Sequence, residues 1–337
     1  MVIDLPVIWA ALIGFVVFLY VALDGFDLGI GLVFPLLNEP GDREVMLNTV
    51  APVWDGNETW MVLGGASLFA AFPVAYSILL PATYLPIIAM LCGLIFRGVA
   101  FEIRAKARRT QHLWDLAFMG GSAVATFAQG VILGTLLQGI PVKDHAYAGG
   151  AFDWFNPFNL FTGLGLLVTY AALGCGWLLF KTDGDLRRRV RMLMWPLAAL
   201  LGITIGVVSI WTIIGQPAVA DRWFALPDLF FFLPVPVLVI AALVGVFLTL
   251  RREHERDHVP FLLTLAILFL GYTGFIISIF PHIIPPSLDI WEASAPRSSQ
   301  IFTLVGAVII IPIILTYNSM AYWVFRGKVR EGDEGYH

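Results

Sequence analysis

Long apolar runs dominate this sequence and restrict what the chain can fold into. A helix needs about 20 apolar residues to cross a hydrocarbon core of about 30 Å. Hydrophobic residues make up 59% of the 337-residue chain and charged residues only 13%, more apolar surface than a water-soluble fold can hide. We therefore predict an all-α polytopic membrane protein, with one integral membrane domain over 1–337. The predicted spans are nine in number: 7–36, 53–72, 76–101, 113–138, 158–180, 193–215, 229–250, 260–281 and 299–325.

The basic residues of the loops are distributed unequally between the two sides of these spans. Only Lys143, Arg222 and Arg297 fall on one side, and Arg97 falls within a span. Because short cytoplasmic loops are rich in Lys and Arg, this asymmetry predicts a periplasmic N-terminus and a cytoplasmic C-terminus. An odd number of spans agrees with that orientation. The remaining basic residues all fall on the other side: Arg43, Arg104, Lys106, Arg108, Arg109, Lys181, Arg187, Arg188, Arg189, Arg191, Arg251, Arg252, Arg256, Arg326, Lys328 and Arg330.

Two pairs of carboxylates lie in or beside the first two spans. Asp24 and Asp27 are three residues apart and therefore share a helix face, and Asp55 and Glu58 have the same spacing. Ionisable groups at membrane depth are costly and are usually retained for a function. The predicted orientation places both pairs toward the cytoplasmic side.

Arg97 lies near the cytoplasmic end of the third predicted span, and Glu102 follows five residues later. Three consecutive helices would thus bring carboxylates and a guanidinium to one depth. Two interpretations stay open. In the first, Arg97 forms structural ion pairs, with Glu102 nearby, and Asp55 or Asn57 caps backbone donors. In the second, the carboxylates of both pairs form a path for protons from the cytoplasm.

The sequence shows few signs of a redox or metal centre. The two cysteines, Cys92 and Cys175, lie in apolar runs and are predicted to be buried packing thiols. No Cys-x-x-Cys-His motif, phosphate-binding loop or nucleophile triad occurs. We therefore predict no metal ligands, no catalytic residues and no nucleic-acid partner in this chain. The six histidines fall in loops or at span ends, so that none pair across the membrane interior as haem ligands: His112, His145, His254, His258, His282 and His337.

Nine segments, spread in order over most of the chain, carry a family resemblance: 24–31, 46–60, 96–101, 114–115, 156–158, 280–281, 285–287, 291–294 and 312–315. On these segments the chain resembles subunit II of the cytochrome bd-type quinol oxidases. The residues 57–59, Asn-Glu-Thr, and the relatively short outer loops are most similar to the cyanide-insensitive branch of that family.

The resemblance implies a fold of two four-helix bundles plus one peripheral helix. It also implies a heterodimer with a haem-bearing subunit I, which holds haems b558, b595 and d and the quinol site. Such a complex of the bacterial inner membrane oxidises quinol and reduces dioxygen to water. It generates proton motive force without pumping, by taking its chemical protons from the cytoplasm.

For this chain, the resemblance implies a proton-path role for Asp55 and an oxygen-access role for Trp60. Glu58, Asp24 and Asp27 are added to the proton path by our own reasoning from the residues. The resemblance further allows a structural quinone or lipid in this subunit and a small single-span accessory subunit.

Two other functions compete with this one at the level of sequence. A proton-coupled secondary transporter would also use intramembrane carboxylates, although no inverted repeat is evident here. A passive scaffold for a catalytic partner would differ from the first hypothesis only in the role of Asp55.

Overall fold

The protein is almost entirely helical in a computed structural model that describes residues 4–39, 41–104, 106–107, 109–252 and 257–332. Eight segments of this described part are long and apolar enough to cross a membrane. This confirms a helical protein with many membrane-spanning segments. The long helices are α1 (Leu5–Val33), α3 (Trp54–Ala71), α4 (Pro73–Arg104), α5 (Gln111–Gln138), α6 (Pro157–Lys181), α7 (Gly184–Gly215), α10 (Pro234–Arg251), α11 (Val259–Ile279) and α12 (Arg297–Val324).

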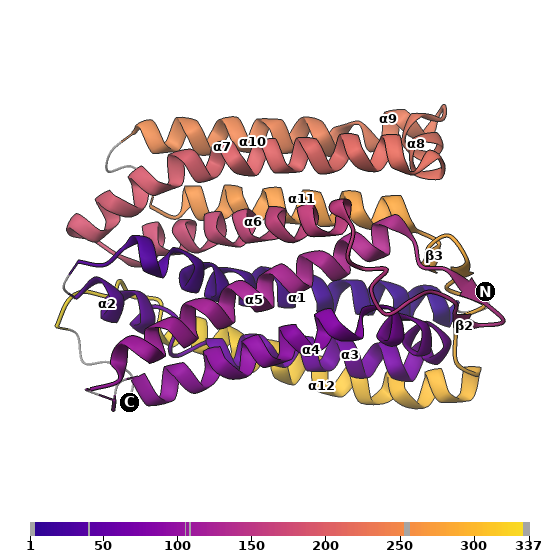
Figure 1. The fold of residues 1–337 in the computed structure, drawn as a ribbon, viewed down its shortest axis with the longest axis horizontal. Helices are drawn as coiled ribbons and strands as arrows, with labels where there is room; N and C mark the ends of the chain where they lie inside the picture. Colours follow the sequence, from indigo (N-terminus) through magenta and orange to yellow (C-terminus); the bar gives the residue numbers. More distant parts are fainter. Residues whose placement is uncertain (1–3, 40, 105, 108, 253–256, 333–337) are drawn as a thin grey trace.

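The short elements lie at the two ends of the long helices. Two hairpins lie near the end where α1 begins, and α2 lies at the opposite end (Figure 1). They are β1 (Val142–Lys143) with β2 (Ala146–Tyr147), β3 (His282–Ile284) with β4 (Leu288–Asp289), η1 (Phe34–Leu36), α2 (Asp42–Asn48), α8 (Pro217–Phe224) and α9 (Asp228–Phe232).

Helix α3 is the one expected span that is not among the eight apolar segments. Its first two turns carry Asp55, Asn57 and Glu58, which lower its mean hydropathy. At 18 residues it is also, together with α10, the shortest of the long helices. The polar residues of α3 therefore need partners inside the protein.

Two expectations from the sequence are wrong in detail. Helix α7 begins at Gly184 rather than near 193, so the arginines over 187–191 lie in its first turns and not in a loop. Arginine is a good helix former whose long side chain keeps its charge in water, which allows the helix to extend past its apolar part. Cys92 is exposed on α4, whereas Cys175 is buried as expected. Arg108, Arg256, His254 and His337 lie outside the described residues.

The long helices pack as two groups. Helices α1, α3, α4 and α5 contact one another, and α6, α7, α10 and α11 form a second set in which α6 packs against both α7 and α11. Helix α6 also packs against α1 and α5 and so joins the two groups, while α12 lies on α3. Figure 1 shows α7 and α10 at one edge and α3, α4 and α12 toward the opposite edge.

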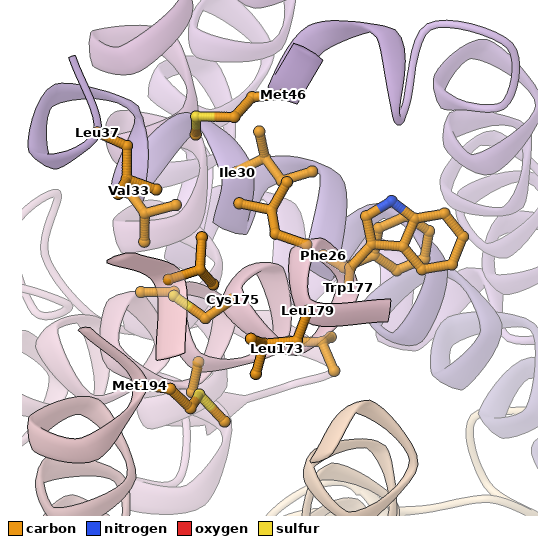
Figure 2. Packing of buried hydrophobic residues seen from close by; sticks show 14 of the residues in the cluster. Phe26, Ile30, Val33, Leu37, Met46, Leu173, Cys175, Trp177, Leu179 and Met194 are labelled. Atoms are coloured by element: carbon orange, nitrogen blue, oxygen red, sulfur yellow. The ribbon is translucent and has the colours of Figure 1, made fainter. Parts of the chain in front are cut away.

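The core between the groups lies along α1 and α6. Phe26 of α1 stacks on Trp177 of α6 with ring centroids 4.3 Å apart. Figure 2 shows these rings beside Ile30, Leu173 and Cys175, with the side chains of both helices interleaved. Burial of such large apolar side chains fixes the register of α1 against α6.

Glycines allow the closest helix contacts. A Cβ on Gly29 would lie 1.9 Å from the Tyr170 carbonyl oxygen, and one on Gly174 would lie 2.5 Å from the Gly29 carbonyl carbon. The α4–α5 contact has the same construction, since a Cβ on Gly93 would lie 2.6 Å from the Gly121 oxygen. Small residues at such crossings are typical of helix packing within membranes.

The segment after α12 returns to the second helix group. Lys181 Nζ, at the end of α6, donates to the carbonyl oxygens of Phe325 at 2.5 Å and Gly327 at 2.7 Å. Lys328 Nζ contacts Asp183 Oδ1 at 2.6 Å and Asp257 Oδ2 at 2.5 Å. This C-terminal clamp, residues 325–330 with their partners, connects the end of α12 to the ends of α6, α7 and α11.

We predict that Gly29→Ala lowers the thermal unfolding midpoint of the purified protein, because the new methyl group must push α1 away from α6. Overpacking of this kind costs about 1–3 kcal/mol or more. The matched control is Gly65→Ala on α3, where an added Cβ has nothing within 4 Å. Equal midpoints for the two variants would contradict the close α1–α6 contact.

A second prediction concerns the C-terminal clamp. The hydrogen bond from Lys328 holds the pKa of Asp183 below its ordinary value. The stabilisation by Asp183 is therefore present above its ordinary pKa of about 3.9 and is lost as the pH falls through the lowered value. At neutral pH, Asp183→Asn should raise hydrogen exchange over residues 325–330 about two- to fivefold, the equivalent of about 0.5–1 kcal/mol for a partly exposed pair.

The difference between this variant and the unmodified chain should shrink toward pH 3. Asp185→Asn is the control, because Asp185 pairs only with exposed Arg188 of its own helix among the ion pairs of the described chain. If Asp185→Asn raised exchange over 325–330 as much as Asp183→Asn, the clamp would be refuted.

Candidate functional site

A buried cluster of ionisable side chains joins α1, α3 and α4. Its centre is Arg97 of α4, whose side chain is 0% exposed. Arg97 Nη1 lies 2.9 Å from Asp24 Oδ1 and 2.7 Å from Glu58 Oε1. Arg97 Nη2 lies 3.7 Å from Asp27 Oδ2. One guanidinium thus faces three carboxyl groups from two other helices.

Local sequence explains how these groups meet. The spacing of three between Asp24 and Asp27 turns both side chains to one face of α1. On the far side of α4, Gly121 of α5 lies so close that a Cβ added to Gly121 would be 2.9 Å from the backbone nitrogen of Arg97. That contact holds the α4 backbone against α5 and leaves the guanidinium to extend toward α1 and α3.

Asn57 extends the cluster to α12. Its Nδ2 donates to Asp27 Oδ2 at 2.7 Å, and its Oδ1 accepts from the Tyr322 hydroxyl at 2.8 Å. One turn before Tyr322, Asn318 Nδ2 lies 3.4 Å from the Gly56 carbonyl oxygen, and a Cβ at Gly56 would meet Asn318 at 2.8 Å. Helix α12 is therefore attached to the cluster through polar contacts.

The expected capping role of Asp55 or Asn57 is wrong. Helix α3 has Val53 at its N-cap and no side-chain cap. Asn57 instead satisfies Asp27, because it points to α1 from the first turns of α3. Sequence reasoning did not identify Tyr322 or Asn318, since both lie in an apolar run far along the chain and only packing brings them to α3.

The exposure of the acidic side chains increases from the α1 pair, Asp24 and Asp27, to the α3 pair, Glu58 and Asp55. The side chains of Asp24 and Asp27 are 1% and 0% exposed, and that of Glu58 is 23% exposed. Asp55, one turn before Glu58, is exposed. Glu58 is thus the member of the cluster that connects buried carboxyl groups with the outside.

Glu102, for which a charge-pairing role near Arg97 was expected, lies outside the cluster. It is exposed on α4, and five residues along a helix places it about 140° around from Arg97. The described ion pairs of Arg97 are with Asp24, Asp27 and Glu58.

An aromatic layer separates the cluster from the polar end of the molecule. Trp54 stacks on Phe101 with centroids 5.2 Å apart, and Phe101 meets Phe118 edge-on at 5.0 Å. The Arg97 guanidinium lies 5.9 Å from the rings of both Trp54 and Phe101. Phe34 continues the layer, 5.2 Å from Phe118.

Beyond this layer lies a second ionic group around Asp115. Its carboxylate binds Arg43 at 2.7 Å and Arg104 at 2.5 Å. An open cleft of about 370 Å³ adjoins it. The cleft is lined by Asn38, Glu39, Gly41, Arg43, Glu44, Arg104, Gln111, His112 and Asp115.

Trp60 is fully buried in an apolar cluster with Val16 and Tyr20 between α1 and α3. Its ring meets Phe15 edge-on at 6.5 Å. Its indole nitrogen has no hydrogen-bond partner among the described residues. Trp60 therefore occupies an apolar position two residues after Glu58.

The described side chains do not form a metal site. No group of three or more His, Cys, Asp or Glu residues there could hold a metal ion. His112, His145 and His258 are exposed, and His282 is half-buried. The ionisable groups that the cluster brings together are three carboxyl groups and one guanidinium.

Known proteins similar to this chain agree on one family. The family described as cytochrome bd terminal oxidase subunit II matches residues 5–325. Cytochrome bd-I ubiquinol oxidase subunit 2 of Escherichia coli (strain K12) is 30% identical over 367 aligned positions, which cover 97% of this chain and 95% of that protein. Cytochrome bd ubiquinol oxidase subunit 2 of Bacillus subtilis (strain 168) is 28% identical and covers 96% of each chain.

A solved structure shares the fold. The bd oxidase from Geobacillus thermodenitrificans contains a chain that superimposes with a TM-score of 0.77 at 17% identity, covering 96% of this chain and 99% of that one. Together with the sequence matches over nearly the whole length, this shows that the chain belongs to the cytochrome bd terminal oxidase subunit II family.

Proposed function

We propose that this chain is the subunit of an electrogenic quinol:oxygen oxidoreductase that supplies a cytoplasmic proton path and an assembly surface to a haem-bearing subunit I. The observation that carries the proposal is the buried cluster, in which one guanidinium faces three carboxyl groups and only Glu58 reaches the surface. The complex would reduce dioxygen to water with electrons from quinol, in the bacterial inner membrane.

The balance of charge in the cluster supports a proton-carrying role. With all three carboxyl groups ionised, Arg97 would neutralise only one of them, and two negative charges would stay buried without a counter-charge. Uncompensated charges are expensive at membrane depth. Protons bound to the carboxyl groups remove that cost, so that the cluster can hold and release protons as its surroundings change.

The geometry favours one route into the cluster. The aromatic layer of Trp54, Phe101 and Phe118 covers the side toward the Asp115 group. The remaining approach is along α3, from exposed Asp55 to Glu58 and then to Asp24 and Asp27. A spacing of three residues places Asp55 and Glu58 on one face, about one helical turn apart.

The topology that fits this route has nine spans, namely the eight apolar segments together with α3. In this proposal the N-terminus is periplasmic and the C-terminus cytoplasmic. Helices α1, α3, α4 and α5 form one four-helix bundle, α6, α7, α10 and α11 form the other, and α12 is the peripheral helix. The basic residues after α4 and α12 support this orientation, which places Asp55 on the cytoplasmic side.

The haems of such a complex, b558, b595 and d, would lie in the partner subunit. The histidines of this chain's described part are exposed or half-buried and do not form a pair of axial ligands, so the residues present do not fit a haem. Trp60 is proposed to border the route of oxygen, because its surroundings are apolar and dioxygen is an apolar molecule. No step of the redox chemistry is assigned to this chain.

We predict that Glu58→Gln and Asp55→Asn each slow quinol-driven oxygen consumption by the assembled complex about tenfold or more, because neither amide can take up and release a proton. Proton-transfer groups typically contribute about 10²–10⁴-fold. The haem absorption spectrum should stay unchanged, which shows that the subunit still assembles with its partner.

Glu102→Gln is the matched control, since Glu102 is an exposed acid on α4 outside the cluster. It should leave turnover unchanged. Wild-type turnover by both the Asp55 and the Glu58 variants, in complexes with full haem content, would end the proton-path proposal and leave a passive scaffold.

A further prediction concerns stability. Arg97→Met leaves the buried Asp24 and Asp27 and the partly exposed Glu58 without their cation, which should destabilise the subunit by about 3–5 kcal/mol and reduce the yield of assembled complex. Replacing Asp27 by Asn in the same chain should restore part of the yield, because it removes one of the unpaired charges. Arg188→Met, at an exposed pair on α7, should have little effect. Normal stability of the Arg97 variant would show that the ion pairs are dispensable.

A further inference from the structure

A second polar network approaches the cluster through Tyr20. Tyr20 lies one turn before Asp24 on the same face of α1, and both residues are buried. Gln129 of α5 donates from Nε2 to the Tyr20 hydroxyl oxygen at 2.7 Å. Tyr170 of α6 donates from its hydroxyl to Gln129 Oε1 at 2.9 Å. Three helices thus contribute to one chain of hydrogen bonds.

The direction of these hydrogen bonds leaves one donor free. Because the Tyr20 oxygen accepts from Gln129, its own O–H proton is available to another acceptor. Asp24 Oδ2 is buried and has no hydrogen-bond partner among the described residues, whereas Oδ1 is bound to Arg97. The free donor and the free acceptor are therefore neighbours on one face of α1.

The network is well suited to hold Tyr20 in place. Tyr20 is 6% exposed and Tyr170 is 0% exposed. The Tyr170 ring packs against Gly25, where an added Cβ would lie 3.0 Å from the ring. Tyr170 fixes the Gln129 amide, and the amide in turn fixes the Tyr20 hydroxyl. Gln129 does not ionise, so the network beyond Tyr20 orients groups and does not transfer protons.

We propose that Tyr20, held by Gln129 and Tyr170, is a positioning residue for Asp24. Its free O–H proton is placed to donate to the unpartnered oxygen of the ionised carboxylate, and this sets the pH range in which Asp24 accepts a proton. This inference rests on the proposed proton path, which it deepens. The other ionisable groups that face Asp24 are Arg97 from α4, Glu58 from α3, Asp27 from α1 and Tyr170 from α6.

The test is Tyr20→Phe in the assembled complex. Loss of the hydroxyl removes the donor that favours the charged carboxylate, so the acidic limb of the turnover–pH profile should move upward by about one pH unit. The infrared carboxyl band that disappears in Asp24→Asn should also shift in Tyr20→Phe. Haem content should stay normal. Tyr170→Phe should produce smaller changes of the same sign, and it replaces Tyr20→Phe if that variant does not assemble.

Tyr272→Phe is the matched control. The Tyr272 hydroxyl of α11 donates to the Gly14 carbonyl oxygen of α1 at 2.8 Å, so this change removes a hydrogen bond to α1 away from the cluster. It should shift neither the pH profile nor the infrared band. The same shifts in Tyr272→Phe as in Tyr20→Phe would overturn the inference, because they would reflect general loosening of α1.

Failure of this inference can be separated from failure of the proposed function. Wild-type turnover in Asp24→Asn would remove Asp24 from the proton path, yet a shifted Asp24 band in Tyr20→Phe would still support the positioning role. An unchanged Asp24 band together with an unchanged pH profile in Tyr20→Phe would overturn the positioning role, whatever the activity of Asp24→Asn.

Discussion

The first helix group depends on the burial of Arg97. A guanidinium without partners at membrane depth would be strongly unfavourable, and it is stabilised here by carboxyl groups from α1 and α3. Helix α3 depends on Arg97 in turn, because its first turns are polar and it is not among the eight apolar segments. Asp24, Asp27 and Arg97 give α3 the partners that allow it to pack against α1, and Asn57 extends this connection to α12.

Close contacts between small residues allow the ionic cluster to form. Gly29 against Gly174, Gly93 against Gly121, and Gly130 against Gly163 bring backbones together and hold α1, α4, α5 and α6 as one unit. Helix α12, largely exposed along its length, is attached to this unit at the level of Asn57 and again by the C-terminal clamp. Packing therefore determines where the helices lie, and polar contacts determine which side chains face each other.

The same arrangement gives the cluster a direction. Aromatic rings close the side toward the Asp115 group, the Tyr20 network ends in a non-ionising amide, and Glu58 is partly exposed toward Asp55. In the proposed function, carboxyl groups approached from Asp55 would exchange protons with the cytoplasmic side of the membrane. A subunit that serves a vectorial reaction would need such an arrangement, whereas a structural ion-pair cluster would not.

The sequence alone determined the helical fold with its long apolar segments, the spacing of the acidic pairs on α1 and α3, and the family resemblance, because apolar runs, three-residue spacing and local motifs are short-range features. Only the tertiary structure decided which groups meet. It shows that Glu102 lies outside the ionic cluster and that Asn57 binds Asp27 instead of capping α3. It also adds Tyr322 and Gln129 to the polar contacts around the cluster. Those contacts join helices far apart in the chain, and their geometry depends on how closely glycine-bearing surfaces approach, which no local pattern encodes.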